Sequence, residues 1–230
     1  MKQLYPFLAA SSFIFISTTL FAATTERPWY LSVDGGVFQG MFDAQYTDQT
    51  DSLPQNYRQT VSQYGYIGGI AAGYSKVVQN QYLLGGELSG SLATNNAYFS
   101  AGASSSAFAD KLAIKGNIDL TFVPGILISE SIAMYGKLGL SYASISADIN
   151  SPTGYTPTYS QSNSTRTVIG GAFGLGIKKK ISDHLAIFTE YNYHDYGTVN
   201  FPTFQNFTAT YAHAAHVYSN SLVVGVSYLI

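Results

Sequence analysis

The chain ends in a segment whose apolar residues occupy every second position. Residues 220–230, "NSLVVGVSYLI", place Leu222, Val224, Val226, Tyr228 and Ile230 on one face. This two-residue period predicts a β-strand rather than a helix. It recurs at residues 27–40, 64–78, 82–92, 111–122, 133–143, 168–177 and 185–194. The sequence therefore predicts eight strands, the last of which needs a partner and a cover for its apolar face.

Short and long connections alternate between these segments. Short polar turns are expected at 78–80, 129–131 and 182–184, and long polar stretches at 41–62, 93–110, 147–166 and 195–216. Tight turns at one end and long loops at the other predict an antiparallel up-and-down meander. If the meander closes into a barrel, the last strand pairs with the first and no edge stays free.

The face opposite the apolar residues indicates which side of the barrel would meet lipid. Only 10% of the residues are charged, against about a quarter in ordinary soluble domains. That face is rich in glycine and small residues, which suits a narrow lumen better than a solvated exterior. The expected fold is an all-β, eight-stranded antiparallel up-and-down transmembrane β-barrel over residues 28–230, with its apolar face toward lipid. The alternative is a soluble β-sandwich with these side chains in its core.

The first residues indicate export. After Lys2, the run "LYPFLAASSFIFISTTLFAA" is apolar and closes in small residues. This order predicts a signal peptide over residues 1–22, cleaved after Ala22 or Ala23. A single membrane-spanning helix is the alternative for a run of this length. The chain contains no cysteine, which excludes disulfides and thiolate sites, and its net charge of −2 gives no attraction for nucleic acid.

Aromatic side chains are expected to form two girdles around the apolar band. Transmembrane barrels carry such girdles at both lipid boundaries. The predicted periplasmic girdle consists of Trp29, Tyr74, Phe122 and Tyr228, and the predicted outer girdle consists of Tyr66, Tyr142, Tyr191 and Tyr193.

The inward face carries charges that a narrow lumen would enclose. They are Asp34, Glu87, Lys115, Asp119, Lys137 and Glu190. An unpaired charge in so confined a space costs several kcal/mol, so Glu87 is expected to pair with Lys115 and Asp119 with Lys137. Eight strands leave an interior just wide enough for side chains to fill. The sequence therefore predicts a closed lumen that conducts little.

These segments together resemble the small eight-stranded outer-membrane barrels of the OmpA-like and opacity-protein type. The resemblance rests on "WYLSVDGGVF", "YGKLGLSYA", "GLGI", "LAIFTEYNY" and "VGVSYLI". It implies insertion into Gram-negative outer-membrane lipid, aided by periplasmic chaperones and the barrel-assembly machinery. It also implies a role in envelope integrity, adhesion or evasion of host defences. Members typically end in phenylalanine; because this chain ends in Ile230, assembly recognition is expected to rest on Tyr228 with Leu222, Val224 and Val226.

Three functions fit this pattern: a structural or surface-interaction barrel, an enzyme that modifies lipid A, and a small channel. The enzyme would need His and Ser on one strand face, whereas the three-residue spacing of His216 and Ser219 places them on opposite faces. His194, near Asp195 or Glu190, is typical of a surface pair. The sequence predicts no catalytic residue, metal ligand or cofactor.

The long connections are therefore expected to carry the function. In the connection at 195–216, the uncharged aromatics Phe201, Phe204 and Phe207 form a candidate contact site for host surface or matrix proteins. The protein is expected to be a monomer without a nucleic-acid partner.

Overall fold

The computed structural model describes residues 27–48, 55–100, 109–149, 162–205 and 210–230. The predicted signal peptide, residues 1–22, lies outside this part of the chain. The described residues form nine strands: β1 (Trp29–Asp48), β2 (Gln55–Val78), β3 (Tyr82–Thr94), β4 (Ala97–Ser100), β5 (Ala109–Ser129), β6 (Ile132–Ile149), β7 (Ser162–Lys180), β8 (Leu185–Gln205) and β9 (Thr210–Leu229).

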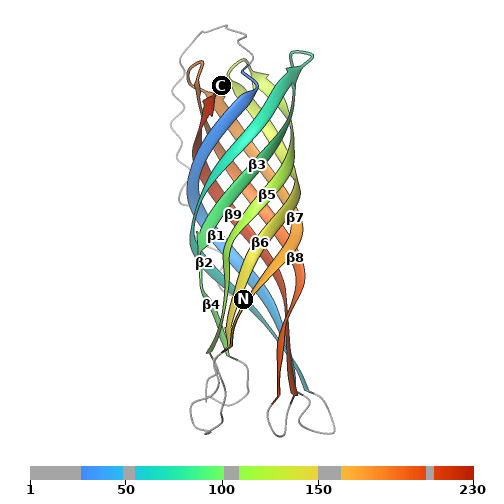
Figure 1. The fold of residues 1–230 in the computed structure, drawn as a ribbon. Coiled ribbons are helices and arrows are strands. Elements are labelled where there is room, and N and C mark those ends of the chain that lie inside the picture. The colour runs from blue at the N-terminus through green and yellow to red at the C-terminus, as the bar shows by residue number, and fades with distance from the viewer. Residues whose placement is uncertain (1–26, 49–54, 101–108, 150–161, 206–209) are drawn as a thin grey trace, which may run out of the picture.

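The strands close into a single antiparallel barrel (Figure 1). Each strand pairs with its neighbour in the chain, except that β3 and β4 both pair with β5, and β9 pairs with β1. The short β4 continues β3 along the same partner, β5, after a break at Asn95 and Asn96. The wall therefore has eight strand positions, and the predicted eight-stranded all-β barrel is confirmed. The apolar last strand, β9, is covered on both edges by β1 and β8.

The strands are steeply tilted. From Tyr228, the register passes through Leu31, Ala72, Leu88, Leu120, Leu140, Gly171 and Asp195 and returns to β9 at Tyr218, ten residues from its start. A stagger of this size around eight strands corresponds to a tilt of about 40°. The short turns, at Gln79–Gln81, at Glu130 and Ser131, and at Ile181–His184, share the end that is uppermost in Figure 1. We call this the turn end and the opposite one the far end.

The strands reach much further toward the far end than the sequence predicts. β1 runs to Asp48 and β2 begins at Gln55, so most of the loop predicted at 41–62 is strand. Likewise, most of the loop predicted at 195–216 belongs to β8 and β9, and the loops at 93–110 and 147–166 are partly strand. The prediction of four long loops starting at these positions is therefore wrong for the described residues.

The reason is that the outward face of a strand is apolar near the turn end and polar toward the far end, while the inward face changes in the opposite sense. Near the turn end of β1, Leu31 and Val33 are exposed while Ser32 faces inward. Toward the far end, Phe42 is buried inside the barrel and Gln45 is exposed. The alternation thus continues toward the far end, but there the apolar residues face inward and the polar residues face outward. A search for outward-facing apolar residues therefore takes this part of the strand for a polar loop.

A band of exposed apolar side chains surrounds the barrel on the turn-end side of this change in polarity. Isoleucine, leucine, valine and aromatic residues of β1, β2, β3 and β5 to β9 contribute to it. Such a band on the outside, with polar residues inside, is the surface that a transmembrane barrel presents to lipid. Within the described residues, no helix is long and apolar enough to cross a membrane.

Candidate functional site

Lys137 lies in the lumen between two buried carboxylates. Its Nζ is 2.7 Å from Oε1 of Glu87 on β3 and 2.6 Å from Oε2 of Glu190 on β8. The second oxygen of each carboxylate accepts a tyrosine hydroxyl: Tyr30 donates to Glu87 at 2.7 Å and Tyr135 to Glu190 at 2.6 Å. Glu87 and Glu190 are only 5% and 6% exposed. All four carboxylate oxygens are therefore satisfied by donors from β1 and β6, as buried charges require.

Glycines of neighbouring strands leave room for the aromatic rings of this layer. A Cβ atom at any of three glycines would collide with a ring. The pairs are Gly73 with Tyr30, Gly176 with Tyr135, and Gly225 with Phe188. The glycine-rich inward face therefore has a steric role, because it allows large side chains to pack inside a narrow barrel.

Lys178 closes this layer at the turn end. Its Nζ lies 4.0 Å from the ring centroid of Tyr30, 5.6 Å from that of Tyr135 and 5.7 Å from that of Phe188. An ammonium over aromatic faces is stabilised by the ring quadrupoles. Although Lys178 begins a run of three lysines next to a short turn, its side chain points into the lumen.

A second polar group lies further along the lumen. Oδ2 of Asp119 is 3.1 Å from Nε2 of His194, and Nδ2 of Asn117 donates to both oxygens of Asp119 at 2.7 Å. The His194 ring stacks on Tyr196 at 6.0 Å with an interplanar angle of 4°. The Tyr196 hydroxyl in turn contacts Ser141 at 3.4 Å.

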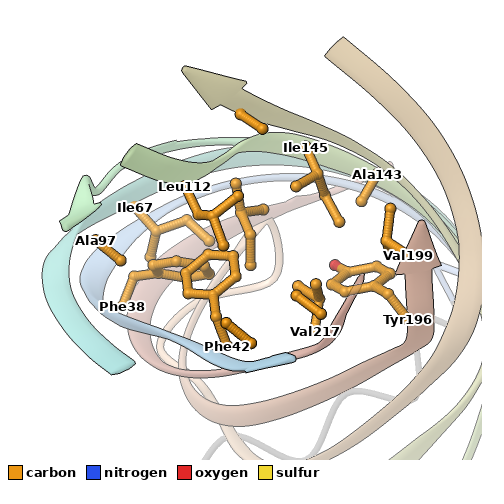
Figure 2. Close-up of a cluster of buried hydrophobic side chains, with 14 of the residues drawn as sticks. Phe38, Phe42, Ile67, Ala97, Leu112, Ala143, Ile145, Tyr196, Val199 and Val217 are labelled. Atoms are coloured by element: carbon orange, nitrogen blue, oxygen red, sulfur yellow. The ribbon is translucent and has the colours of Figure 1, made fainter. Parts of the chain in front are cut away.

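Apolar side chains fill the lumen toward the far end (Figure 2). In Figure 2, Phe42, Ile145, Tyr196 and Val217 point from different strands toward the middle of the barrel. The buried members of this far-end apolar cluster are Phe38, Phe42, Ala44, Ile67, Ala97, Leu112, Ile114, Ala143, Ile145, Ala147, Tyr196, Val199, Ala215, Val217 and Val223. The lumen thus changes from charged and polar to apolar along its length.

Lys115, one of the six charges expected in the lumen, is exposed instead. A β-bulge between Ile114 and Gly116 interrupts the pairing of β5 with β6. Because the extra residue shifts the alternation, Leu112 and Ile114 turn inward, and Lys115 does not follow them. The pairs expected from sequence are corrected accordingly: Glu87 pairs with Lys137.

The other expected charges lie inside the barrel. Glu87, Lys137 and Glu190 form the ion-paired group, Asp119 pairs with His194 rather than with Lys137, and Asp34 lines the cavity between the two groups. Sequence reasoning missed Tyr30, Tyr135 and His194 as lumen residues. The signal was available, because all three occupy inward positions of the same alternation that predicted the strands.

The predicted girdle aromatics mostly point outward. Trp29, Tyr66, Tyr74, Phe122, Tyr142, Tyr191 and Tyr228 are exposed, whereas Tyr193 is half-buried between Phe173 and Tyr218. Trp29 and Tyr74 meet edge to face at 5.0 Å. Their arrangement as two girdles at lipid boundaries stays a prediction.

The terminal strand presents its expected face outward. Leu222, Val224, Val226 and Tyr228 are exposed, and the Ile230 N–H donates to the Trp29 carbonyl at 2.8 Å. The role of these residues in assembly stays a prediction.

The loop aromatics are placed only in part. Phe201 and Phe204 fall within β8, but their side chains lie outside the described part of the structure, as does all of Phe207. The proposed contact site is therefore untested.

The histidines considered for catalysis lie on different faces. His216 points outward and its Nε2 is 3.1 Å from Oδ1 of Asp195, whereas Ser219 of the same strand is buried inside. The buried His194 pairs with Asp119, across the lumen from its own strand.

Comparison with known proteins gives a consistent picture. A family model described as outer membrane protein beta-barrel domain matches residues 7–228. A protein of Coxiella burnetii (strain RSA 493 / Nine Mile phase I), described as uncharacterized, is 29% identical over 99% of this chain and 96% of its own length. The 31 kDa outer-membrane immunogenic protein of Brucella melitensis biotype 1 is 26% identical over 74% of this chain and 71% of its own.

A solved structure is similar in fold. The outer membrane protein OprG from Pseudomonas aeruginosa superposes with a TM-score of 0.53 at 16% identity, over 87% of this chain and 95% of that one. At this identity the likeness concerns the fold alone.

Proposed function

Because the chain belongs to the outer membrane protein beta-barrel domain family, we propose that it is a non-conducting surface protein that acts through its far end. The family places it in the outer membrane of a Gram-negative cell, with its exposed apolar band in lipid. The surface role and the closed lumen are the parts that need testing.

The filling of the lumen is the observation that carries the proposal. Near the turn end, Lys137 joins β6 to β3 and β8 through two ion pairs. Near the far end, the apolar cluster fills the interior with side chains from seven of the strands. An eight-stranded barrel has little space beyond its side chains. A continuous aqueous path would have to cross both layers, so we do not expect this lumen to conduct ions.

The far end is suited to contacts outside the membrane. Beyond the apolar band, the strands continue with polar side chains outside and apolar ones inside, as in a water-soluble barrel. With this arrangement, the strands form a rigid wall that extends beyond the lipid and holds the connecting segments. The Brucella relative is named as an outer-membrane immunogenic protein, which accords with a surface-exposed far end. Adhesion or another host contact is the proposed use.

A binding experiment tests the surface role. The purified, refolded barrel is screened against host matrix and complement proteins, and a binder is then tested against a variant with Phe201, Phe204 and Phe207 replaced by serine. We expect the variant to keep the heat-modifiable band shift of a folded barrel and to lose most of the binding. The control replaces Tyr155 and Tyr159, in a different connection, by serine. Unchanged binding after the triple replacement removes this segment from the contact, and failure of the intact barrel to bind any partner contradicts the adhesion role.

A further inference from the structure

The pairing of β7 with β8 stops well before the far end. From the turn end it extends as far as Gly171 with Asp195, and the described residues of the two strands form no pair beyond that point. Both strands nevertheless continue, because β7 stays paired with β6 back to Ser162 and β8 with β9 as far as Gln205. In Figure 1 the strands of the far end separate into two groups. We call the unpaired stretch between β7 and β8 the seam.

A β-bulge turns β8 away from β7 at the start of the seam. Gly197 has a φ of +65°, and its N–H donates to Oδ1 of Asp195 at 2.9 Å. The register of β8 with β9 shifts at the same place, between Asp195 and Thr198. Such a bulge bends its strand and increases the twist. A Cβ atom at Gly170 of β7 would still collide with the Asp195 carbonyl, so the two strands touch here and part directly beyond.

The β7 edge of the seam is open to a further strand, whereas the β8 edge is protected. Residues 162–170 contain no proline, and their pairing with β6 has no bulge. The β8 edge carries the bulge and Pro202, which has no N–H to donate. β2 also loses its pairing with β3, at Tyr66, but there β4 continues the wall along β5. The β7 edge is therefore the best template for an added strand.

Most of this edge lies beyond the apolar band. Ile169 is the last apolar side chain that β7 exposes outward, and Thr167 and Thr165 follow it on the same face. A polypeptide can therefore reach the edge from the aqueous side without entering the lipid.

The inward side chains of the edge define what would fit beside them. Val168 packs against the far-end apolar cluster but is only half-buried. Arg166, two residues away on the same face, pairs across β6 with the fully buried Ile145 and yet is exposed at the seam. Its guanidinium forms no hydrogen bond or ion pair with any described residue. The edge thus offers one incompletely covered apolar side chain and one positive charge.

We propose that the β7 edge binds an extended segment of a partner protein as an added antiparallel strand, with an acidic side chain opposite Arg166 and an apolar one opposite Val168. Because the partner would run antiparallel to β7, its apolar residue precedes its acidic residue by two positions. In such complexes the main-chain hydrogen bonds provide affinity and the alternate side chains provide specificity. The inference rests on the proposed surface role and specifies the chemistry of the contact.

A second copy of this chain is a less suitable occupant. Residues 162–170 contain Arg166 and no acidic residue. Symmetric antiparallel pairing of two β7 edges would therefore bring two arginines together without a carboxylate between them, and like charges on facing strands are destabilising. The exposed positive charge favours an acidic partner instead.

A peptide titration of the refolded mature chain in a zwitterionic detergent tests the proposal. The probe is a short, fluorescently labelled synthetic peptide in which valine and glutamate alternate with threonine, and its anisotropy reports binding. We expect saturable binding that weakens about tenfold in Arg166→Glu, because the charge pair is replaced by a repulsion. The same peptide with lysine in place of glutamate should show the opposite preference.

Arg58→Glu is the matched control, because Arg58 is an exposed arginine at the far end of β2, away from the seam. This variant should bind the acidic peptide like the unmodified chain. Equal affinity of the unmodified chain and Arg166→Glu overturns the site. A barrel that dimerises and takes up no peptide overturns it in favour of a second copy.

Hydrogen exchange on the unmodified barrel tests the edge without any substitution. Alternate amides of a strand point to opposite sides, so every second amide within residues 165–170 faces the seam. We expect these amides to exchange quickly in the unliganded barrel and slowly with the peptide bound. Peptide-dependent protection confined to other strands contradicts binding at the β7 edge.

The surface role and the β7 edge can fail separately. Any matrix or complement protein that binds the intact barrel is measured again with Arg166→Glu. Full binding by this variant leaves the surface role intact and overturns the edge as its contact. Peptide binding with the expected charge preference, but no partner in the screen, supports the edge and contradicts the adhesion role.

Discussion

Lys137 is the residue on which two buried carboxylates depend. Both of its ion pairs lie in the lumen, and Glu87 and Glu190 would be left buried and uncompensated without it. We expect Lys137→Met to lower the free energy of unfolding by about 3 to 5 kcal/mol, the usual cost of breaking a buried ion pair from one side. Denaturant unfolding of the barrel refolded into lipid vesicles measures this change.

Lys115→Ala is the control for that experiment, since both residues were expected in the lumen from sequence alone. Lys115 is exposed at the bulge, and substitutions at such surface positions usually change stability by less than about 0.5 kcal/mol. If the two variants lost similar amounts of unfolding free energy, the ion-paired group around Lys137 would not contribute the expected stability.

Gly73 has no side chain, and this leaves room for the ion-paired group around Lys137. A Cβ at this position would collide with the Tyr30 ring, and Tyr30 holds one oxygen of Glu87. We expect Gly73→Ala to cost about 1.5 kcal/mol or more, because a hydrogen bond to a buried charge is displaced. Gly35→Ala, at an outward glycine where a Cβ has space, should be nearly neutral in the same unfolding assay. Equal effects would show that the contact with Tyr30 is unimportant.

At the scale of the strand, alternation predicted the wall but not its length or its irregularities. The period of two found all eight wall positions and assigned Ile118, Leu120 and Phe122 correctly to the outside. The same alternation, continued back to Leu112 and Ile114, would place them outside as well. They lie inside because a bulge adds a residue without a distinctive sequence mark, and only the adjacent Gly116 hints at it.

The candidate site was predictable only in part, for a related reason. Sequence placed Glu87, Lys137 and Glu190 on the inward face, but their pairing depends on the stagger between strands that are far apart in the chain. The alternation alone carries no information on that stagger. The Asp119–His194 contact, which joins β5 to β8 across the lumen, was missed for the same reason.

The polarity of the two strand faces gives a prediction at this scale. Ile118 and Leu140 are 55% and 62% exposed within the apolar band, so arginine at either position should cost about 2 to 4 kcal/mol if it lies near the bilayer midplane. Ala71 faces the lumen, and Ala71→Ser should be nearly silent. The fraction of heat-modifiable, folded barrel after refolding measures both. Equal tolerance on the two faces would overturn the assignment of the outer face to lipid.

For the whole molecule, the lumen has two layers in series that oppose ion flow. The first is the group around Lys137 near the turn end, and the second is the far-end apolar cluster, in which Phe42 and Ile114 are almost fully buried. An ion must pass both layers in turn, so the layer with the higher resistance limits the current. Opening either layer alone should therefore leave the conductance low.

This reasoning gives a prediction for planar bilayers. The unmodified barrel should show at most rare, small openings, and so should Lys137→Met. Phe42→Ala with Ile114→Ala removes apolar volume from the second layer, at a stability cost of several kcal/mol, and should also conduct little while the ion-paired layer is intact. Only the combination of all three substitutions is expected to give a steady current, provided that it still refolds. A current from the Phe42 and Ile114 variant alone would show that the charged layer is no barrier. A steady large conductance in the unmodified protein would overturn the closed lumen, because an open path would then have to pass both layers without any substitution.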